Sequence, residues 1–220
     1  MPDDRNQRAR YLGFVAHEIK NPLSTALWSA DLLKRLDPAE RAGPRAEKMI
    51  DASLRALRRM RRLVDDFFTV ERLAQRVLEV RREPTPVRGL LDASIALLAE
   101  KDRTEAAGWT YDVPDGLQAD CDGELTKRAL RAVFEQVMRS GTGPLTIVGQ
   151  GDDKRCAIWV GRRGDANVAP RVPPPPEDQA GGDLDGGVLG FLLARTVMDV
   201  HGGSIDEQDG GLRVSIPEAA

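Results

Sequence analysis

Apolar residues in the first third of the chain recur at spacings of three and four. Over residues 5–36 and, after a turn that contains Pro38 and Pro44, over residues 45–81, this spacing predicts two long amphipathic helices. The apolar face of the first would carry Leu12, Val15, Ile19, Leu23, Ala26, Ala30 and Leu33, and that of the second Ile50, Leu54, Leu57, Met60, Val64 and Phe67. Two such helices with a short connection are typical of an antiparallel hairpin.

A single two-helix hairpin cannot bury its whole apolar surface. Pairing with a second copy makes a four-helix bundle, and a symmetric homodimer is the simplest way to cover both apolar faces. The alternative is a hairpin that packs on the C-terminal part of its own chain.

The run Glu83-Pro84-Thr85-Pro86 is expected to break the second helix and to mark a domain boundary, with a helical hairpin over residues 1–82 and a second domain over residues 83–220. Beyond the boundary the pattern predicts helices over 88–100, 122–139 and 187–201, and strands over 109–113, 117–120, 145–149, 156–160, 204–206 and 212–216. Helices interleaved with strands predict an α+β fold, with the helices on one face of a mixed sheet.

Charge and composition narrow the functional classes. The 220 residues include 32 Lys and Arg against 35 Asp and Glu, so no basic excess indicates a nucleic-acid partner. No apolar run approaches the ~20 residues that span a bilayer and no signal-peptide core is present, so we expect no membrane association and a cytoplasmic location. Cys121 and Cys156 lack metal-ligand spacing, and no metal site is expected on this chain.

His17 is the residue with the clearest candidate chemistry. At ~100° per residue it points away from the apolar face of the first helix, and Asn21 follows one turn later on the same side. Pro22 cannot bond the carbonyl of Glu18, so we expect a bend there and a free carbonyl close to the imidazole. The helix therefore displays a histidine beside an amide.

The stretch His17-Glu18-Ile19-Lys20-Asn21-Pro22-Leu23 resembles the phosphoacceptor box of two-component histidine kinases. The resemblance implies that His17 takes a phosphoryl group on a ring nitrogen. It also implies that Glu18 assists proton transfer and that Asn21 positions water for dephosphorylation of a partner.

The second domain resembles the ATP-binding domain that follows the helical hairpin in the same family. The strongest local match is the glycine-rich stretch 186–191, with Gly187 and Gly190, followed by His201-Gly202-Gly203. In the family such a stretch lets backbone N–H groups approach nucleotide phosphates. His201 itself is expected to have a structural role at a helix end, in cooperation with the helix dipole.

Several positions depart from that family pattern. Ala132 and Gln136 stand where the family has two asparagines, one of which ligates Mg²⁺, and Arg162 stands in place of the adenine-reading aspartate. Arginine has only donors and cannot accept a hydrogen bond from the adenine amino group, unless Asp165 substitutes through a shifted loop. Val188 replaces a glycine, and the nucleotide lid is replaced by a run with four prolines, Val172-Pro173-Pro174-Pro175-Pro176.

We therefore predict a degenerate ATP-binding domain that has lost ATP, with no cofactor on this chain and with Mg²⁺ supplied by a partner receiver domain. The expected function is histidine phosphotransfer between receiver aspartates through His17, without ATP. The alternatives are a pseudokinase binding module that regulates a response regulator or kinase, and a divergent ATP-dependent sensor kinase or phosphatase. Phosphotransferase activity is favoured over ATP-dependent kinase activity.

A basic face of the second helix has two interpretations. It carries Arg55, Arg58, Arg59, Arg61 and Arg62. It is either a solvated helix face or a docking surface for the carboxylate-rich pocket of a response-regulator receiver.

Overall fold

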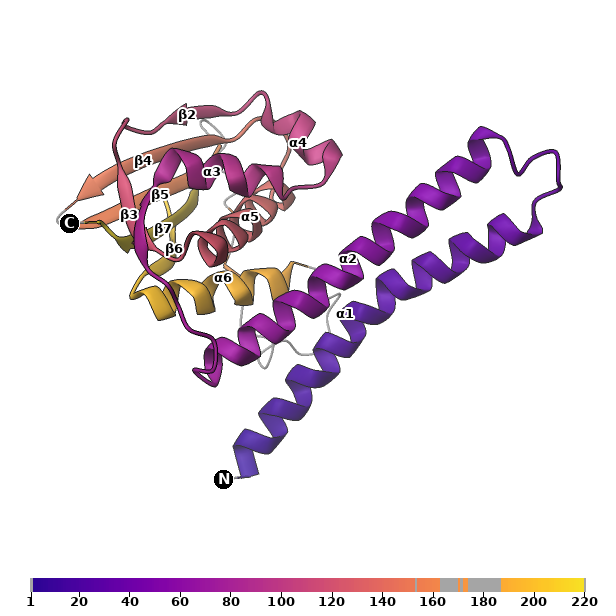
Figure 1. Ribbon diagram of the computed structural model, residues 1–220, viewed down its shortest axis with the longest axis horizontal. Coiled ribbons are helices and arrows are strands. Elements are labelled where there is room, and N and C mark those ends of the chain that lie inside the picture. Colours follow the sequence, from indigo (N-terminus) through magenta and orange to yellow (C-terminus); the bar gives the residue numbers. More distant parts are fainter. Residues whose placement is uncertain (1, 153, 163–169, 171, 174–186, 220) are drawn as a thin grey trace. The chain divides into compact units, whose positions relative to one another are not determined.

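The computed structural model describes residues 2–152, 154–162, 170, 172–173 and 187–219 (Figure 1). It divides into two compact units, one built on residues 1–68 and the other on residues 69–174 and 190–220. The division lies within the second long helix, and the boundary predicted at residue 83 stays a prediction about independently folding segments. Asp165 and Pro174–Pro176 lie outside the described residues.

The first unit contains the predicted helical hairpin. Helix α1 (Pro2–Arg35) runs through Pro22 as one continuous helix, and α2 (Pro44–Ala74) returns antiparallel to it. Two contacts define the pairing of the helices. The Ser53 hydroxyl donates to the Ala26 carbonyl at 3.4 Å, and the rings of Tyr11 and Phe67 lie 5.7 Å apart.

The apolar residues of the hairpin lie in two stripes on each helix rather than one. The seam between α1 and α2 buries Phe14, Val15, Pro22, Ala26, Ala46, Ala56 and Leu63. Leu12, Leu23, Leu27, Ile50, Leu54, Leu57 and Phe68 are all more than a third exposed. The prediction of a single apolar face on the first helix is therefore wrong, because Val15 and Ala26 are buried whereas Leu12 and Leu23, predicted on the same face, are exposed. The exposed residues form a second stripe, named here the outer apolar stripe.

Helix α2 ends at Ala74, several residues before the predicted end at residue 81. Arg76 adopts a left-handed conformation with φ of 55°. The N–H of Val77 bonds to the Arg72 carbonyl at 2.9 Å, and that of Arg76 bonds to the Leu73 carbonyl at 3.0 Å. This is the Schellman pattern of helix termination, with arginine in the position that glycine usually occupies. Without a glycine, the sequence had no local signal for this end.

The second unit is built around a five-stranded mixed sheet. The bounds of its strands agree closely with the predicted ones. The spatial order is β2 (Thr110–Asp112), β4 (Thr146–Asp152), β5 (Arg155–Gly161), β7 (Gly211–Pro217) and β6 (Ser204–Gln208). Strands β2 and β4 are parallel, and the remaining neighbours are antiparallel. The turn between β6 and β7 has positive φ at Asp209 and Gly210, which is typical of a two-residue hairpin.

The sequence pattern missed one strand in this unit and merged two helices into one. The proline run forms a short strand, β1 (Glu83–Pro86), which pairs antiparallel with β3 (Gln118–Cys121). Prolines are tolerated there because β1 is an edge strand with one neighbour. The helix expected over 88–100 is two helices, α3 (Val87–Ala96) and α4 (Glu100–Ala106), because the chain leaves the helical conformation at Ala99.

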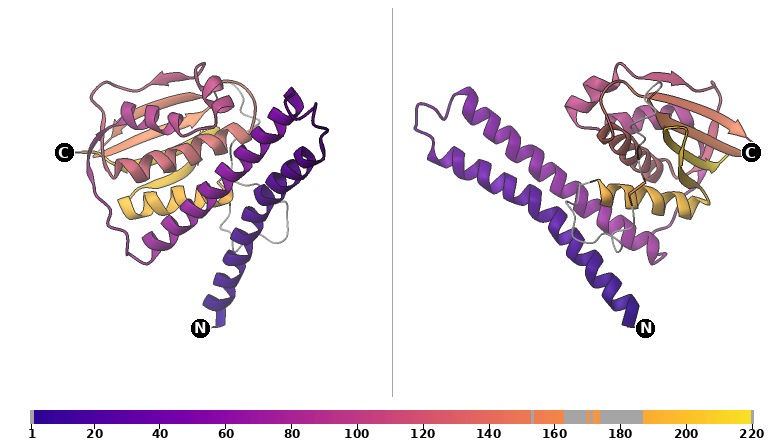
Figure 2. Two further views of the ribbon diagram at one scale, coloured as in Figure 1. Left: turned by 45° about the vertical axis from the view of Figure 1, so that its right-hand side comes forward. Right: turned by 180° about the vertical axis from the view of Figure 1, so that it is seen from behind.

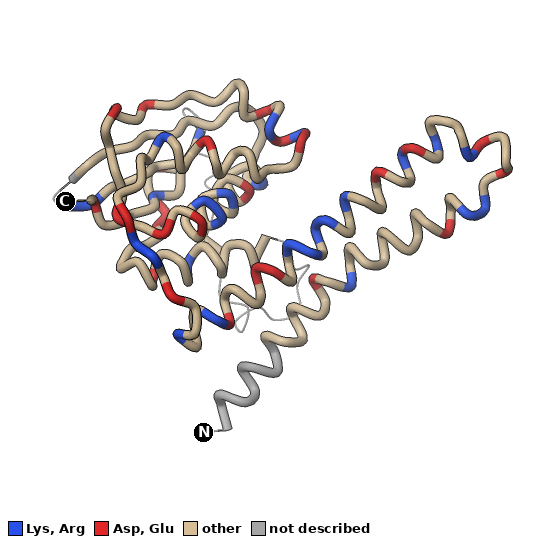
Figure 3. The backbone as a smooth tube through the Cα atoms, in the orientation of Figure 1, with Lys and Arg blue, Asp and Glu red and all other residues tan. Residues whose placement is uncertain are grey.

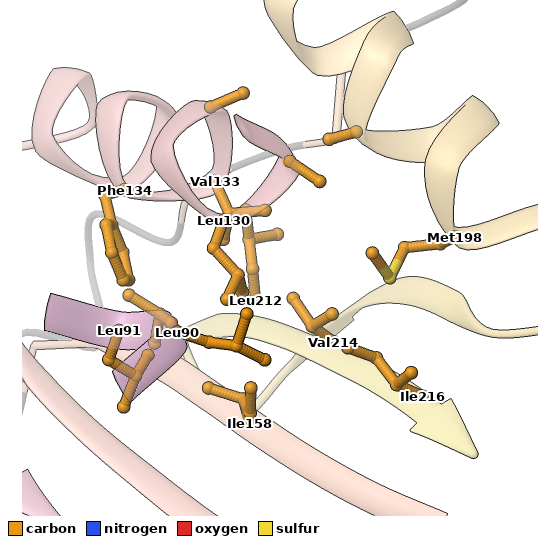
Figure 4. Close-up of a cluster of buried hydrophobic side chains, with 14 of the residues drawn as sticks. Leu90, Leu91, Leu130, Val133, Phe134, Ile158, Met198, Leu212, Val214 and Ile216 are labelled. Carbon is orange, nitrogen blue, oxygen red and sulfur yellow. The ribbon is translucent and has the colours of Figure 1, made fainter. Parts of the chain in front are cut away.

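Helices α3, α5 (Gly123–Arg139) and α6 (Val188–His201) lie on one face of the sheet, as Figures 1 and 2 show. The core between them and the strands contains Leu90 and Leu91 from α3, Leu130, Val133 and Phe134 from α5, Met198 from α6, and Ile158, Leu212, Val214 and Ile216 from the sheet (Figure 4). The predicted fold class is thus confirmed: a two-helix hairpin followed by an α/β sandwich.

The His201-Gly202-Gly203 sequence joins α6 to the sheet. Gly202 has a φ of 71°, which a residue with a side chain rarely adopts. A Cβ on Gly203 would lie 2.2 Å from the Ser215 carbonyl oxygen. The His201 Nδ1–H donates to the Val197 carbonyl at 2.7 Å, and Nε2 accepts the backbone N–H of Asp122 at 2.8 Å.

These bonds require a neutral His201. Asp122 in turn caps α5, because its Oδ1 accepts from the N–H of Leu125, and its Oδ2 accepts from the N–H of Arg81. Burial lowers the pKa of His201, and the nearby Arg82 adds to this effect, against opposing contributions from the Val197 carbonyl, Asp122 and Asp120. The predicted structural role is confirmed, although the ring is neutral and does not act as a cation on the helix dipole.

We predict that the stability of the protein falls as His201 is protonated. The unfolded chain takes up this proton first, near pH 6.5, because the folded pKa is lower. The free energy of unfolding is thus largest above about pH 6.5 and declines as the pH falls toward the folded pKa. In urea titrations between pH 8 and 5, His201→Gln should lose about 1–3 kcal/mol at pH 8 and show a flatter pH dependence. An equally steep pH profile in the variant would contradict this assignment.

Candidate phosphoacceptor site

His17 is exposed on α1, and Asn21 is exposed one turn later on the same side. In ~100° steps, His17 lies about 130° from the middle of the seam and about as far from the middle of the outer apolar stripe. The imidazole therefore points away from both apolar surfaces of its helix. It stays accessible to a macromolecular partner even when the outer apolar stripe is covered.

Glu18 lies in a different environment from its neighbour. It is 1% exposed and falls on the seam side of α1 with Phe14 and Pro22. Asp66 of α2 is also buried, at 4% exposed. The sequence did not indicate this burial, because successive helical residues differ by ~100° and the match to the family motif concerns residue type alone. The proton-transfer role of Glu18 stays a prediction.

Trp28 is a further residue on the His17 face that sequence reasoning missed. It lies eleven residues after His17, which is about three helical turns, and its side chain is 66% exposed. An exposed tryptophan is uncommon on a free surface and is enriched among residues that anchor protein interfaces. The spacing of four and seven residues from His17 to Asn21 and from Asn21 to Trp28 is a helical one, so the sequence alone could have placed Trp28 on the His17 face.

The arginine-rich segment of α2 divides between two faces. Arg55, Arg58 and Arg59 are exposed; Arg55 and Arg59 lie on the side of α2 away from the outer apolar stripe, and Arg58 lies at its edge, four residues after Leu54. Arg61 instead lies within that stripe. Figure 3 shows the run of basic residues in the middle of α2, within the hairpin that displays His17. Either interpretation of the basic face, as solvated surface or as docking site, is compatible with this exposure.

Two of the positions that depart from the family pattern have structural hydrogen bonds. The Gln136 Oε1 accepts a short hydrogen bond from Nη2 of Arg139 on the same helix. Arg162 follows β5 and donates to carbonyls in and after the last turn of α5. Its Nη1 bonds to Val137 at 2.7 Å, its Nη2 to Gly141 at 2.7 Å, and its Nε to Gly143 at 3.2 Å.

Arg162 therefore acts as a side-chain cap for the C-terminus of α5. The last carbonyls of a helix lack N–H partners and carry the negative end of the helix dipole. A guanidinium supplies hydrogen-bond donors to these carbonyls and a positive charge beside the dipole. A carboxylate at this position would repel the same carbonyls.

The glycine-rich positions can be placed in part. Gly187 is buried directly before α6, and Gly190 lies in its first turn. A Cβ on Gly190 would be 3.6 Å from the Ala132 Cβ, an ordinary contact distance. Val188 is 8% exposed. The N–H of Val172, at the start of the proline run, bonds to Oε1 of Glu207 at 2.5 Å.

Comparisons with known proteins agree with this architecture. Residues 7–76 match the family model of the His Kinase A (phospho-acceptor) domain, HisKA. The chain is 27% identical to the sensor protein SphS of Synechococcus elongatus and 23% identical to the sensor protein KdpD of Escherichia coli, with 98% and 99% of this chain aligned. It spans 56% of SphS and 25% of KdpD.

Solved structures show the same fold. The histidine kinase AdeS of Acinetobacter baumannii superposes with a TM-score of 0.63 at 15% identity, over 93% of this chain and 98% of AdeS. Full-length ShkA, solved in complex with AMPPNP, gives a TM-score of 0.56 at 19% identity, over 96% of this chain and 46% of ShkA.

Residues 7–76 are thus similar to the HisKA phosphoacceptor domain, and the chain has the two-part fold of the histidine kinases AdeS and ShkA, a helical hairpin followed by an α/β sandwich. As a family, HisKA domains dimerise and transfer phosphoryl groups to response regulators. Within the described residues, no helix has the length and apolar character of a bilayer span. The same residues contain no group of three or more His, Cys, Asp or Glu able to hold a metal ion.

We predict that Arg162→Ala destabilises the second unit by about 1–3 kcal/mol, because the terminal carbonyls of α5 lose charged donors. Urea unfolding of the full chain measures the effect. Arg103→Ala is the matched control, since Arg103 is exposed in the last turn of α4 and its removal changes the net charge equally. Equal unfolding free energies for the two variants would show that the Arg162 cap contributes nothing.

Proposed function

We propose that this protein is a dimeric histidine phosphotransfer protein that moves phosphoryl groups between receiver-domain aspartates through His17 without ATP. The observation that carries the proposal is the Arg162 cap. At the position that matches the family's adenine-reading aspartate, this chain has a guanidinium whose donors are directed to the carbonyls of α5. A group with no acceptor cannot perform the aspartate's role in adenine recognition.

The Gln136 contact supports the same proposal. Its amide oxygen, at one of the two positions where the family has asparagine, already accepts from Arg139. A metal ion would have to share that oxygen with the Arg139 guanidinium, whose positive charge disfavours a second cation beside it. Neither Gly187 nor Gly190 compensates for these two positions, because a glycine has no side chain that could bind adenine or Mg²⁺.

The proposed transfer step needs few groups on this chain. The unprotonated ring nitrogen of His17 attacks the phosphorus of a receiver aspartyl phosphate. The P–N bond forms, the P–O bond breaks, and its electron pair stays on the receiver carboxylate. The proton on the other ring nitrogen is then released, with Glu18 as the proposed acceptor. The receiver supplies Mg²⁺, and the reaction is reversible because donor and acceptor are both high-energy phosphoryl carriers.

The surroundings of His17 fit a receiver as the partner. Asn21 can hold a water beside the histidine, and Trp28 offers a large apolar anchor three turns away on the same face. The exposed arginines of α2, named above, would attract the acidic pocket of a receiver and increase its association rate.

A second candidate is an ATP-dependent sensor histidine kinase with a divergent pocket. The comparisons favour this candidate, because the curated relatives are sensor proteins and the chain aligns with them over almost its full length. A pseudokinase binding module is the third candidate. Such a module would not require the histidine, acid and amide of the phosphoacceptor box, so the presence of these residues argues against it.

We predict that His17→Gln abolishes phosphoryl transfer and leaves the dimer intact, because His17 is exposed and outside both apolar stripes. Receivers from the same genome, phosphorylated with acetyl phosphate, are mixed with the wild-type protein or the variant. Label should leave at least one receiver and appear on the wild-type protein alone. Transfer to the variant, or no transfer from any receiver to the wild type, would refute the proposal. Light scattering checks the oligomeric state.

We also predict that the protein shows neither binding of Mg-ATP nor autophosphorylation from it. Isothermal titration calorimetry at millimolar Mg-ATP should detect no saturable heat, and radiolabelled ATP should leave no label on His17. A micromolar dissociation constant with label at His17 would establish the sensor-kinase candidate instead. Saturable binding without label would favour a nucleotide-binding pseudokinase.

A further inference from the structure

The outer apolar stripe of α2 has one charged member. Ile50, Leu54, Leu57 and Phe68 are each between 42% and 53% exposed and follow one another at spacings of three, four or their sums. Arg61 falls in the same line, four residues after Leu57 and seven before Phe68. Among the described residues it has no hydrogen-bond or ion-pair partner. An arginine in an otherwise apolar interface is costly unless an anion pairs with it.

Arg61 also lies at the level of His17. The Ser53–Ala26 and Tyr11–Phe67 contacts define the antiparallel pairing of α1 and α2. Counting from either contact, Arg61 lies opposite residues 17 and 18 of α1. Within one chain, however, Arg61 belongs to the outer apolar stripe of α2 and not to the seam, so it is directed away from its own α1.

A second copy of the hairpin places Arg61 beside the helical turn that carries the partner's His17. HisKA domains dimerise as a family, and exposed stripes at heptad spacing on both helices are the surface that a helical partner would cover. A two-fold axis along the hairpin keeps every residue at its own level, so α2 of one copy lies against the outer apolar stripe of the partner's α1. Arg61 then lies beside the partner helix at the turn that carries His17, next to Ala16 and Lys20.

On these grounds we infer that Arg61 completes the phosphoryl-binding site of the partner subunit's His17. The inference rests on the proposed function and adds a residue to its site. The guanidinium donates to the phosphoryl oxygens of phosphohistidine and stabilises the charge that accumulates on them during transfer. Arg61 is a positioning and charge-stabilising residue in trans, while His17 keeps the covalent bond. The phosphoryl group is the anion that offsets the cost of placing Arg61 in the interface.

Phosphoramidate is a suitable probe, because it needs no receiver. The His17 nitrogen attacks its phosphorus, the P–N bond of the donor breaks, and ammonia leaves after taking up a proton. In homodimers, Arg61→Ala should lower the rate of His17 phosphorylation by about tenfold, and Arg61→Lys should recover part of it. Arg45→Ala, at the remote end of the hairpin, is the control for loss of one positive charge and should leave the rate unchanged.

Mixed dimers decide whether Arg61 acts across the interface. Two differently tagged chains are co-expressed and the dimers that carry both tags are purified, so that each dimer contains one functional His17. In the first mixed dimer, one chain carries His17→Gln and keeps Arg61, and the other keeps His17 and carries Arg61→Ala. The functional His17 then still has Arg61 across the interface, so the rate should equal that of a dimer whose only substitution is one His17→Gln. When both substitutions are on the same chain, the rate should fall about tenfold. The reverse pattern, or equal rates, would overturn the inference.

Disulfide cross-linking tests the placement without any phosphoryl transfer. Ala16→Cys and Arg61→Cys on separate chains should form a rapid intersubunit disulfide, because both side chains are exposed in one chain and adjacent in the proposed dimer. Ala16→Cys with Arg55→Cys is the control pair and should not cross-link. The native Cys121 and Cys156 are buried and give a low background. No cross-link in a confirmed dimer would overturn the placement, whereas a cross-link without transfer to His17 would mean that the proposed function alone has failed.

Discussion

The division of apolar residues between two stripes is the constraint on which the hairpin depends. One stripe on each helix is buried in the seam, and the other, which includes Leu54 and Phe68, remains exposed in a single chain. His17 is roughly equidistant in helical angle from both. Burial of the outer apolar stripe can therefore stabilise an assembly without covering the phosphoacceptor, since the two surfaces lie on different sides of one helix.

The ATPase-like unit depends instead on a small number of polar side chains that join distant segments. Asp122 holds the start of α5, the N–H of Arg81 and, through its own N–H, the imidazole of His201. Arg162 satisfies carbonyls at the other end of α5. Both ends of one helix are thus held by residues from outside it. The fold therefore has internal hydrogen-bond partners for both ends of α5.

Much of this architecture could be predicted because it arises from local periodicity. The two long helices, the strand positions of the five-stranded sheet and the exposure of His17 all follow from spacings of two, three or four residues. The predictions failed where no local signal exists. Arg76 ends α2 in a conformation usually left to glycine, and β1 forms in a proline run because β3, more than thirty residues later, pairs with it. The early end of α3 likewise had no glycine or proline to mark it.

By itself, the sequence determined that the chain has a helical hairpin, that the hairpin displays His17 with Asn21, and that an α+β domain follows. Only the tertiary structure decided the environments of the neighbouring polar groups. Glu18 is buried in the seam, Gln136 bonds to Arg139, and the Arg162 guanidinium caps α5. The physical reason is that helical periodicity is a property of adjacent residues, whereas the partner of a polar side chain is set by segments that meet only when the chain folds.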